Sequence, residues 1–368
     1  MAKKINYKLL TPGPLSTSDT VKQAMMADHC TWDNDYKAIT QKIRSNLLKL
    51  AQCSEETYTA VLMQGSGTFG VESAITSTVG REGKLLILAN GAYGERMEEI
   101  CRHAGLRYRI EHFPYWTVPD AEVCARILDE DPEITHVSMV HSETTSGILN
   151  DIASVAGAVK ARGKVFIVDA MSSFAGVEIP VEELGIDFII TSANKCVQGV
   201  PGFALIICRR DEAEKCRGKA VSLSLDLYEQ WQGQEKDGKW RFTSPTHVVL
   251  AFEQAMEELE AEGGVKARAK RYAENNCYLI EEMEKLGYRT YVPREHQGPI
   301  ITTFYYQENR KYSFQQMYDY IKSRGYAIYP GKVTEAETFR IGNIGEIYRE
   351  DIEKLIGIYQ DFLKEYNK

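Results

Sequence analysis

The chain has 368 residues, of which 43% are hydrophobic and 26% are charged, a composition typical of a soluble globular protein. Its length is enough for one large domain and a smaller second one. The net charge of −8 comes without any basic cluster, which argues against nucleic-acid binding. The N-terminus leads into Ile-Asn-Tyr rather than a long apolar stretch, so we expect no signal peptide, no membrane span and a cytoplasmic protein.

Short apolar runs alternate with segments of helical spacing through the first two thirds of the chain. Each run is rich in Val, Ile and Leu and is followed by Gly, Asn, Asp or Ser. This alternation is typical of an α/β fold, with a mostly parallel sheet flanked by helices. The predicted strands cover residues 59–63, 84–89, 135–140, 164–168, 187–191 and 203–208, and predicted helices between them cover 70–79, 94–104 and 152–161.

The pattern changes near Pro245. Two long amphipathic helices are predicted over 246–262 and 265–285, interrupted at Gly263-Gly264. Short strands (289–292, 300–304, 339–341) and two further helices (313–324, 349–366) follow. We therefore expect a large domain over residues 15–262 and a smaller α+β domain over 263–368, with residues 1–14 packing near the small domain and the ligand site.

The eight cysteines form no CxxC pair, and none stands beside a histidine at the spacing of metal ligands. This pattern indicates reduced thiols and no metal site.

Parallel sheets bind ligands at the carboxyl ends of their strands, so the residues that follow each predicted strand are the candidates for a site. Gln64-Gly-Ser-Gly-Thr-Phe-Gly70 follows the first predicted strand and precedes a helix. Its glycines allow a ligand to approach the backbone, and the helix N-terminus offers unpaired N–H groups. The hydroxyls of Ser66 and Thr68 add donors. This segment favours a phosphate, although it also fits an ordinary turn and it is not a Walker A loop.

Three other strand ends carry side chains of interest: Tyr93, Asp169 and Lys195. Taken singly, each has a simpler explanation, as a core aromatic residue, a helix cap and a solvated lysine. In a parallel sheet, however, Asp169 and Lys195 would project into one crevice, opposite the predicted phosphate loop.

Pyridoxal phosphate explains this set of groups. Its aldehyde needs a lysine for a Schiff base, and its pyridine nitrogen needs a carboxylate. Its phosphate needs N–H groups and hydroxyls, and its ring needs a flat partner such as Tyr93. The sequence therefore predicts a pyridoxal-phosphate enzyme with the cofactor attached to Lys195.

Several separate motifs, in the same order, carry a resemblance to a known family. They are Leu9-Leu-Thr-Pro-Gly-Pro-Leu15, Cys30-Thr-Trp-Asp33, His141-Ser-Glu-Thr-Thr-Ser-Gly147, Arg241-Phe-Thr-Ser-Pro-Thr-His247, Tyr329-Pro-Gly-Lys332 and Phe339-Arg-Ile-Gly-Asn-Ile-Gly345. With them the chain resembles the fold-type I, class V (alanine–glyoxylate-like) aminotransferases over nearly its whole length. It is most similar to the branch that transfers the amino group of 2-aminoethylphosphonate to pyruvate.

The resemblance implies a role for each matching residue. Lys195 would hold the cofactor and shuttle a proton, and Asp169 would pair with the pyridine nitrogen. Tyr93 and Met171 would pack against the two ring faces. The groups expected around the phosphate and ring edge are Ser66, Gly67, Thr68, Thr144 and Asn194, the last at a position where related branches have Gln or His.

The resemblance also implies how substrate and partner subunit are bound. Arg340 would clamp the anion of small amine and 2-oxo acid substrates. Trp240 and Thr243 would reach the cofactor phosphate from a neighbouring subunit, which predicts a homodimer with shared active sites.

Three other interpretations remain open from the sequence. An alanine–glyoxylate or serine–pyruvate aminotransferase would share Lys195, Asp169 and Arg340, and chiefly Cys30-Thr-Trp-Asp33 argues against it. A cysteine desulfurase-like lyase would carry His where Asn194 stands and a catalytic Cys on a mobile loop. A cofactor-free binding protein would lack visible absorbance.

Overall fold

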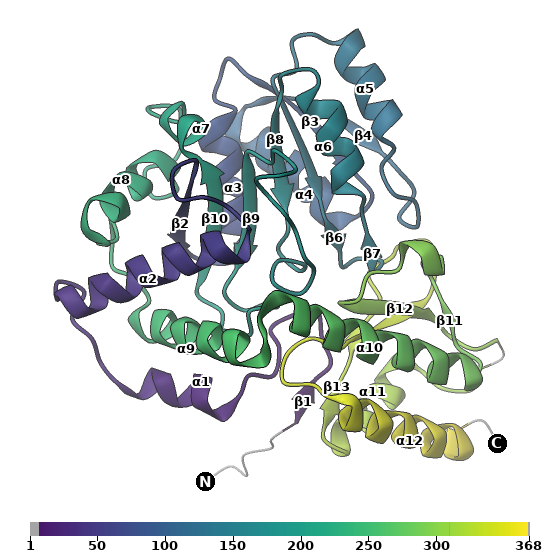
Figure 1. Cartoon of the computed structure of the whole chain (residues 1–368). Helices are drawn as coiled ribbons and strands as arrows, with labels where there is room; N and C mark the ends of the chain where they lie inside the picture. The colour runs from purple at the N-terminus through teal and green to yellow at the C-terminus, as the bar shows by residue number, and fades with distance from the viewer. Residues whose placement is uncertain (1–6, 309, 367–368) are drawn as a thin grey trace.

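The computed structural model describes residues 7–308 and 310–366. They form a larger part around a seven-stranded sheet and a smaller part around a four-stranded sheet (Figure 1). Within the described residues, no helix has the length and apolar character needed to cross a membrane. All eight cysteines are free.

The large sheet has the strand order β2-β10-β9-β8-β5-β3-β4. Six strands share one direction, and β10 is antiparallel to both of its neighbours. The strands are β2 (Tyr58–Gln64), β10 (Phe203–Arg209), β9 (Phe188–Ser192), β8 (Val165–Asp169), β5 (His136–Val140), β3 (Lys84–Ala89) and β4 (Arg107–His112).

The six strands predicted for this sheet are confirmed within one or two residues at their ends. The edge strand β4 was not predicted. Its sequence, Arg-Tyr-Arg-Ile-Glu-His, is largely polar and half exposed, because an edge strand has one neighbour and does not need an apolar run.

Helices cover both faces of the large sheet, and alternate strand residues feed two separate cores. One face packs against α3 (Gly67–Thr78), α4 (Ala92–Ala104) and α8 (Leu227–Asp237). The other packs against α2 (Asn34–Leu50), α5 (Ala121–Glu130), α6 (Ile152–Lys160) and α9 (Thr246–Glu262). Short elements are α1 (Asp19–Gln23), α7 (Arg210–Glu214) and the hairpin of β6 (Ser142–Glu143) and β7 (Ile148–Leu149).

The smaller part has its own sheet, β11-β12-β15-β14, and its own core. Its strands are β11 (Arg289–Thr290), β12 (Ile301–Tyr305), β15 (Thr338–Gly342) and β14 (Tyr329–Pro330), and its helices are α10 (Gly264–Lys285), α11 (Phe314–Ser323) and α12 (Arg349–Tyr366). Gly263, with φ of 108°, ends α9, and α10 follows at once.

The N-terminal segment joins this smaller part (Figure 1). β1 (Lys8–Leu9) pairs in parallel with β13 (Tyr326–Ala327), and Leu10 belongs to the small core. The turn that follows crosses to the large sheet, where the Pro12 carbonyl accepts a hydrogen bond from Lys195. Residues 1–6, part of the segment predicted to pack here, lie outside the described residues.

Candidate active site

The carboxyl ends of β2, β8 and β9 and the start of α4 bring four predicted groups to one place. Asp169 is the last residue of β8, Lys195 follows β9, and Tyr93 lies in the first turn of α4. Lys195 is close enough to Tyr93 and Asp169 for both to act on its charge. Met171 packs directly on Gly67 of the loop after β2. The strand ends therefore bring these side chains close together at one end of the large sheet.

Lys195 lies half buried under the N-terminal turn. Its Nζ donates a hydrogen bond to the Pro12 carbonyl. A Cβ atom added at Gly13, whose φ is +116°, would lie 2.6 Å from Nζ, so only glycine fits against this side chain. Burial lowers the pKa of Lys195, although Tyr93 and Asp169 oppose that shift. The amine therefore loses its proton more readily than a solvated lysine and is a better nucleophile.

Asp169 is a buried carboxylate with one oxygen free. Oδ1 accepts from the Met171 N–H at 2.9 Å, and no donor among the described residues reaches Oδ2. Burial raises the pKa of Asp169 to about 6, Glu143 adds to that shift, and Lys195 opposes it. A buried carboxylate with a free oxygen needs a partner, and a protonated ring nitrogen is one that suits it.

The loop after β2 offers free N–H groups beside Met171 and so close to these side chains. Gly65 has φ of +109°, and Ser66 precedes α3 without capping it through its side chain. No acceptor among the described residues reaches the N–H groups of Gly67 and Thr68. Arg96, from α4, places Nη1 3.4 Å from Thr68 Oγ1. Two free N–H groups at a helix N-terminus with a cation beside them make an anion site.

Glu143 fixes the start of α4, and the sequence did not assign it a role. Its carboxylate is fully buried; Oε2 accepts from the Tyr93 N–H at 3.1 Å and Oε1 from the Thr145 hydroxyl at 2.6 Å. The Thr145 hydroxyl in turn accepts from the Ala92 N–H at 3.2 Å. Burial raises the pKa of Glu143. Glu143 packs so closely on Gly91 that a Cβ there would collide with it, so this glycine has no side chain with which to cap α4. A glycine directly before a helix, where Ser, Thr, Asp or Asn is the usual cap, is the feature of the sequence that could have indicated a separate group such as Glu143 at the start of α4.

Tyr93 is surrounded by cations. The Arg96 guanidinium lies 4.9 Å from the ring centroid and the Lys332 ammonium 4.1 Å from it. Burial alone would raise the pKa of Tyr93. A hydrogen bond with Thr144 and the charge of Lys332 outweigh burial, so the pKa is lowered. The ring therefore sits in a strongly positive environment.

Arg340 is a buried guanidinium without a carboxylate partner. It lies in the middle of β15 and is 5% exposed. Nε donates to the Pro330 carbonyl at 3.0 Å and Nη1 to the Thr144 carbonyl at 2.7 Å. Within the described residues no acidic oxygen lies within 4.0 Å of it, and no acceptor reaches Nη2. A buried charge of this kind favours an incoming anion.

Comparison with known proteins identifies the family. Residues 25–349 match the family described as Aminotransferase class-V. The chain belongs to the class V aminotransferases. It is therefore a transaminase that uses pyridoxal phosphate, and its fold is the α/β fold expected for fold-type I.

Relatives of this aminotransferase include proteins named for phosphonate substrates. One from Lysinibacillus sphaericus (strain C3-41), named 2-aminoethylphosphonate–pyruvate transaminase, is 53% identical over 97% of this chain and 98% of that protein. A bifunctional phosphonoacetaldehyde hydrolase/aminoethylphosphonate transaminase from Clostridioides difficile (strain 630) is 51% identical over 97% of this chain and 56% of its own length. The structure of alanine–glyoxylate aminotransferase from Nostoc sp. superposes with a TM-score of 0.91 over 98% of this chain and 96% of that one, at 23% identity, which concerns the fold alone.

The groups of this aminotransferase fit its cofactor. The buried amine of Lys195 suits the aldehyde, the free Asp169 oxygen suits the ring nitrogen, and the free N–H groups of the loop after β2 suit the phosphate. Asn194 lies half buried next to Lys195 and accepts from the Ser192 hydroxyl at 3.0 Å, which leaves its amide nitrogen available.

The prediction for the Trp240 side chain is wrong. The indole ring is buried in the core of its own chain, edge-on to Phe203 with ring centroids 5.7 Å apart. Its N–H donates to the Thr40 hydroxyl at 3.2 Å, so the ring does not reach a neighbouring subunit. The sequence favours a contact with the neighbouring subunit because Trp240 lies beside the Arg241–His247 motif. In the structure the ring packs against Phe203 of β10 instead. Thr243, in contrast, is exposed, and its carbonyl accepts from Gln64 at the end of β2.

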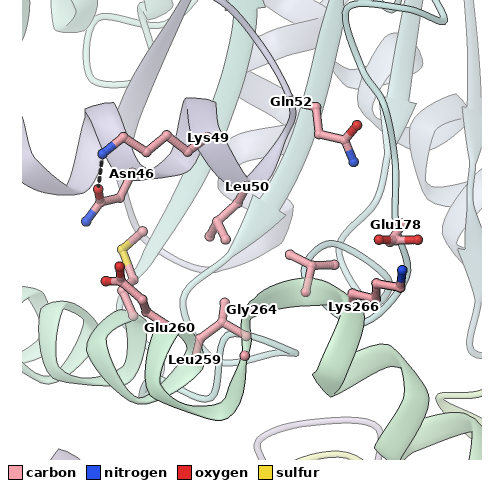
Figure 2. A pocket seen from close by; sticks show the side chains of 12 residues that line it. Asn46, Lys49, Leu50, Gln52, Glu178, Leu259, Glu260, Gly264 and Lys266 are labelled. Carbon is pink, nitrogen blue, oxygen red and sulfur yellow. Dashed lines mark hydrogen bonds between the residues drawn. The ribbon is translucent and has the colours of Figure 1, made fainter.

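A pocket of about 500 Å³ lies apart from these groups, between α2, α9 and the start of α10 (Figure 2). Leu50, Leu259 and Glu260 line it together with Lys49 and Lys266. None of the predicted site residues contributes to its wall, so we assign no chemistry of the family to it.

Proposed function

We propose that this aminotransferase moves the amino group of 2-aminoethylphosphonate to pyruvate, producing phosphonoacetaldehyde and L-alanine. The observation that carries the proposal is the buried, unpaired Arg340 guanidinium beside Tyr93. An anion clamp of this geometry accepts a phosphonate or a carboxylate. The name of the relative that is 53% identical over 97% of the chain supports the choice of amino donor.

When bound, pyridoxal phosphate supplies an aldehyde that attaches amines and a protonated ring that withdraws electrons. We propose that Ser66, Gly67 and Thr68 hold its phosphate, with Arg96 supplying a positive charge. Asp169 keeps the ring nitrogen protonated. Tyr93, fixed through Glu143, and Met171 hold the ring between them, and Thr144 and Asn194 lie at its edge.

Lys195 has a second role in the proposed reaction. Once the substrate amine has replaced it, its Nζ is free and neutral because burial disfavours its charge. Nζ then takes the proton from the amino-bearing carbon of the substrate. It returns a proton to the second carbon that would be bonded to the same nitrogen. Arg340 holds the substrate anion so that the carbon faces Nζ. The same groups act in reverse when pyruvate is the acceptor.

Arg340→Ala is expected to reduce kcat/KM by at least about 100-fold for both 2-aminoethylphosphonate and pyruvate, because a buried charge interaction costs roughly 3–5 kcal/mol to break from one side. Steady-state kinetics of the two substrates measure this. Arg340→Lys is the matched control, since it keeps the charge but loses the fork, and we expect an intermediate loss. A loss below tenfold in Arg340→Ala would show that another group clamps the anion.

The substrate assignment is tested by incubating the holoenzyme with pyruvate and each of 2-aminoethylphosphonate, L-serine and L-cysteine, and measuring L-alanine. We expect 2-aminoethylphosphonate to be the best donor, with one phosphonoacetaldehyde formed per alanine. Preference for L-serine, or faster transfer from L-alanine in a parallel incubation with glyoxylate in place of pyruvate, would favour the other class V aminotransferases. Release of sulfide from L-cysteine would favour the desulfurase-like lyase.

We also propose a homodimer with shared active sites, acting in the cytoplasm. Large apolar side chains stand exposed around the loop after β2, namely Phe69, Leu223 and Phe242. Thr243 is exposed next to them, and its carbonyl already contacts Gln64 of that loop. We expect sedimentation to give about twice the chain mass of 41.6 kDa. A monomer that is fully active at low concentration would contradict the shared site.

The domain boundary is proposed to lie at Gly263, with residues 15–262 as the large domain and 263–368 as the small one. The left-handed conformation of Gly263 between α9 and α10 supports it, as does the separate core of the small sheet.

A further inference from the structure

The loop between β14 and β15 brings a second cation from the small sheet to the site. Lys332 stands two residues after Pro330, whose carbonyl accepts from Arg340 Nε at 3.0 Å. Its Nζ lies 4.1 Å from the centroid of the Tyr93 ring, on α4 of the large part. Lys332 and Arg340 are thus held by one hairpin and approach the same aromatic ring.

The ammonium of Lys332 has no counter-ion of its own. Among the described residues no carboxylate oxygen lies within 4.0 Å of Nζ, and no acceptor forms a hydrogen bond with it. Lys8 and Lys84, by contrast, pair with Asp351 at 2.7 Å and Asp131 at 2.6 Å. The nearby carboxylate of Glu143 already accepts from the Tyr93 N–H, in the first turn of α4, and from the Thr145 hydroxyl. A half-buried lysine with three free donors favours an anion that enters the site.

A single guanidinium balances the charge of a carboxylate. A phosphonate carries up to two negative charges and three oxygens, so after Arg340 has bound two oxygens one oxygen and one charge remain. The cofactor phosphate has its own cation, because Arg96 lies at Thr68. The unpaired charge of Lys332 therefore matches the part of a phosphonate that Arg340 leaves unmatched.

We propose that Lys332 is a specificity-determining residue: it donates to the phosphonate of the amino donor and so favours a doubly charged substrate over a carboxylate. This inference rests on the proposed function and names the residue that would distinguish its two substrates. Pyruvate, as a monoanion, needs Arg340 alone.

Binding of two inert analogues tests the inference directly. 2-Hydroxyethylphosphonate and 3-hydroxypropionate differ in the anion and lack the amine, so neither reacts. Calorimetry at pH 8 with the holoenzyme compares the wild type with Lys332→Met, with Lys332→Arg, which keeps the charge, and with Lys354→Met, which removes an exposed charge on α12. We expect Lys332→Met to weaken the phosphonate by roughly 10- to 100-fold, as for a hydrogen bond between charged groups. The carboxylate should change by less than about threefold, since Arg340 remains.

Lys332→Arg should restore most of the phosphonate affinity, and Lys354→Met should behave as the wild type. Equal weakening of both analogues, no weakening of either, or loss of bound cofactor in Lys332→Met would overturn the inference, since each means that Lys332 serves something other than the phosphonate.

Half-reactions separate this inference from the proposed function. Holoenzyme is mixed with excess 2-aminoethylphosphonate or L-alanine, without an acceptor, and loss of the visible cofactor band is followed. A wild type that fails to react with 2-aminoethylphosphonate would end the proposed function, whatever the analogues show. If the wild type reacts, Lys332→Met should slow the phosphonate half-reaction by roughly 10-fold or more and change the alanine half-reaction little. An equal effect on both half-reactions would refute the role of Lys332 alone.

Discussion

Lys195→Ala is expected to lower kcat for transamination by roughly 10³-fold or more, because the variant loses both the covalent attachment of the cofactor and the group that moves the proton. The structure supports this double loss. The charge of Lys195 acts on the Asp169 carboxylate, and the Pro12 carbonyl and Gly13 hold Nζ in place under the N-terminal turn.

Two further variants serve as controls, one for the charge of Lys195 and one for the loss of a lysine elsewhere. Lys195→Arg keeps a positive charge, but its pKa stays too high for it to act as a base, so we expect it to be as inactive as Lys195→Ala. Lys354→Ala on the exposed face of α12 should retain full activity. Circular dichroism checks that all three variants fold. Activity of Lys195→Ala within tenfold of the wild type would contradict both roles.

Asp169→Asn is expected to have opposite effects on the holoenzyme and the apoprotein. In the holoenzyme an amide cannot keep the ring nitrogen protonated, and kcat should fall by roughly 10²- to 10⁴-fold, the range of effects assigned to positioned proton-transfer groups. Steady-state kinetics with saturating cofactor measure this loss. Asp169→Glu is the matched control, because it keeps the negative charge and changes only the length of the side chain.

In the apoprotein the same substitution should increase stability above about pH 6. The carboxyl pKa is 3.8 in the unfolded chain and about 6 in the folded one, so between these values the folded state binds more protons. The free energy of unfolding therefore falls as pH rises from about 4 to about 6, and the full penalty remains at higher pH. Removing the carboxylate should recover up to roughly 3 kcal/mol at pH 8.

Denaturant unfolding of the wild-type apoprotein and Asp169→Asn at pH 4.5 and pH 8 measures this difference. The two proteins should be closer in stability at pH 4.5. Equal stability at both pH values, with activity preserved, would mean that Asp169 neither carries a burial penalty nor serves the ring nitrogen.

How far the sequence predicts this site depends on the kind of interaction. Asp169, Lys195 and the loop after β2 follow apolar strands, so strand order alone places them at one edge of the sheet, and the structure agrees. The edge strand β4 is not predicted by its sequence, because most of its residues are polar. Trp240 was assigned to a neighbouring subunit from its motif, but whether a Trp faces the core or the surface depends on packing that the motif does not encode.

The cations around Tyr93 show which part of the site the sequence does not predict. Arg96 stands one helical turn after Tyr93, and Lys332 lies beside the four-stranded sheet, more than two hundred residues away. In sequence both look like solvated charges. Only the approach of the β14–β15 hairpin to α4 brings Lys332 to the ring, and only the lack of a carboxylate near it, among the residues described, indicates an anion as its partner.

Lys195 is expected to carry the cofactor. This attachment is tested most directly by reducing the holoenzyme with borohydride, which makes a covalently held cofactor permanent, and then locating the modified residue by peptide mass spectrometry. We predict one modified site per chain, at Lys195, and none when the enzyme is first converted to its amino form with 2-aminoethylphosphonate. Modification of another lysine, or a reduced protein that carries no cofactor, would contradict the account.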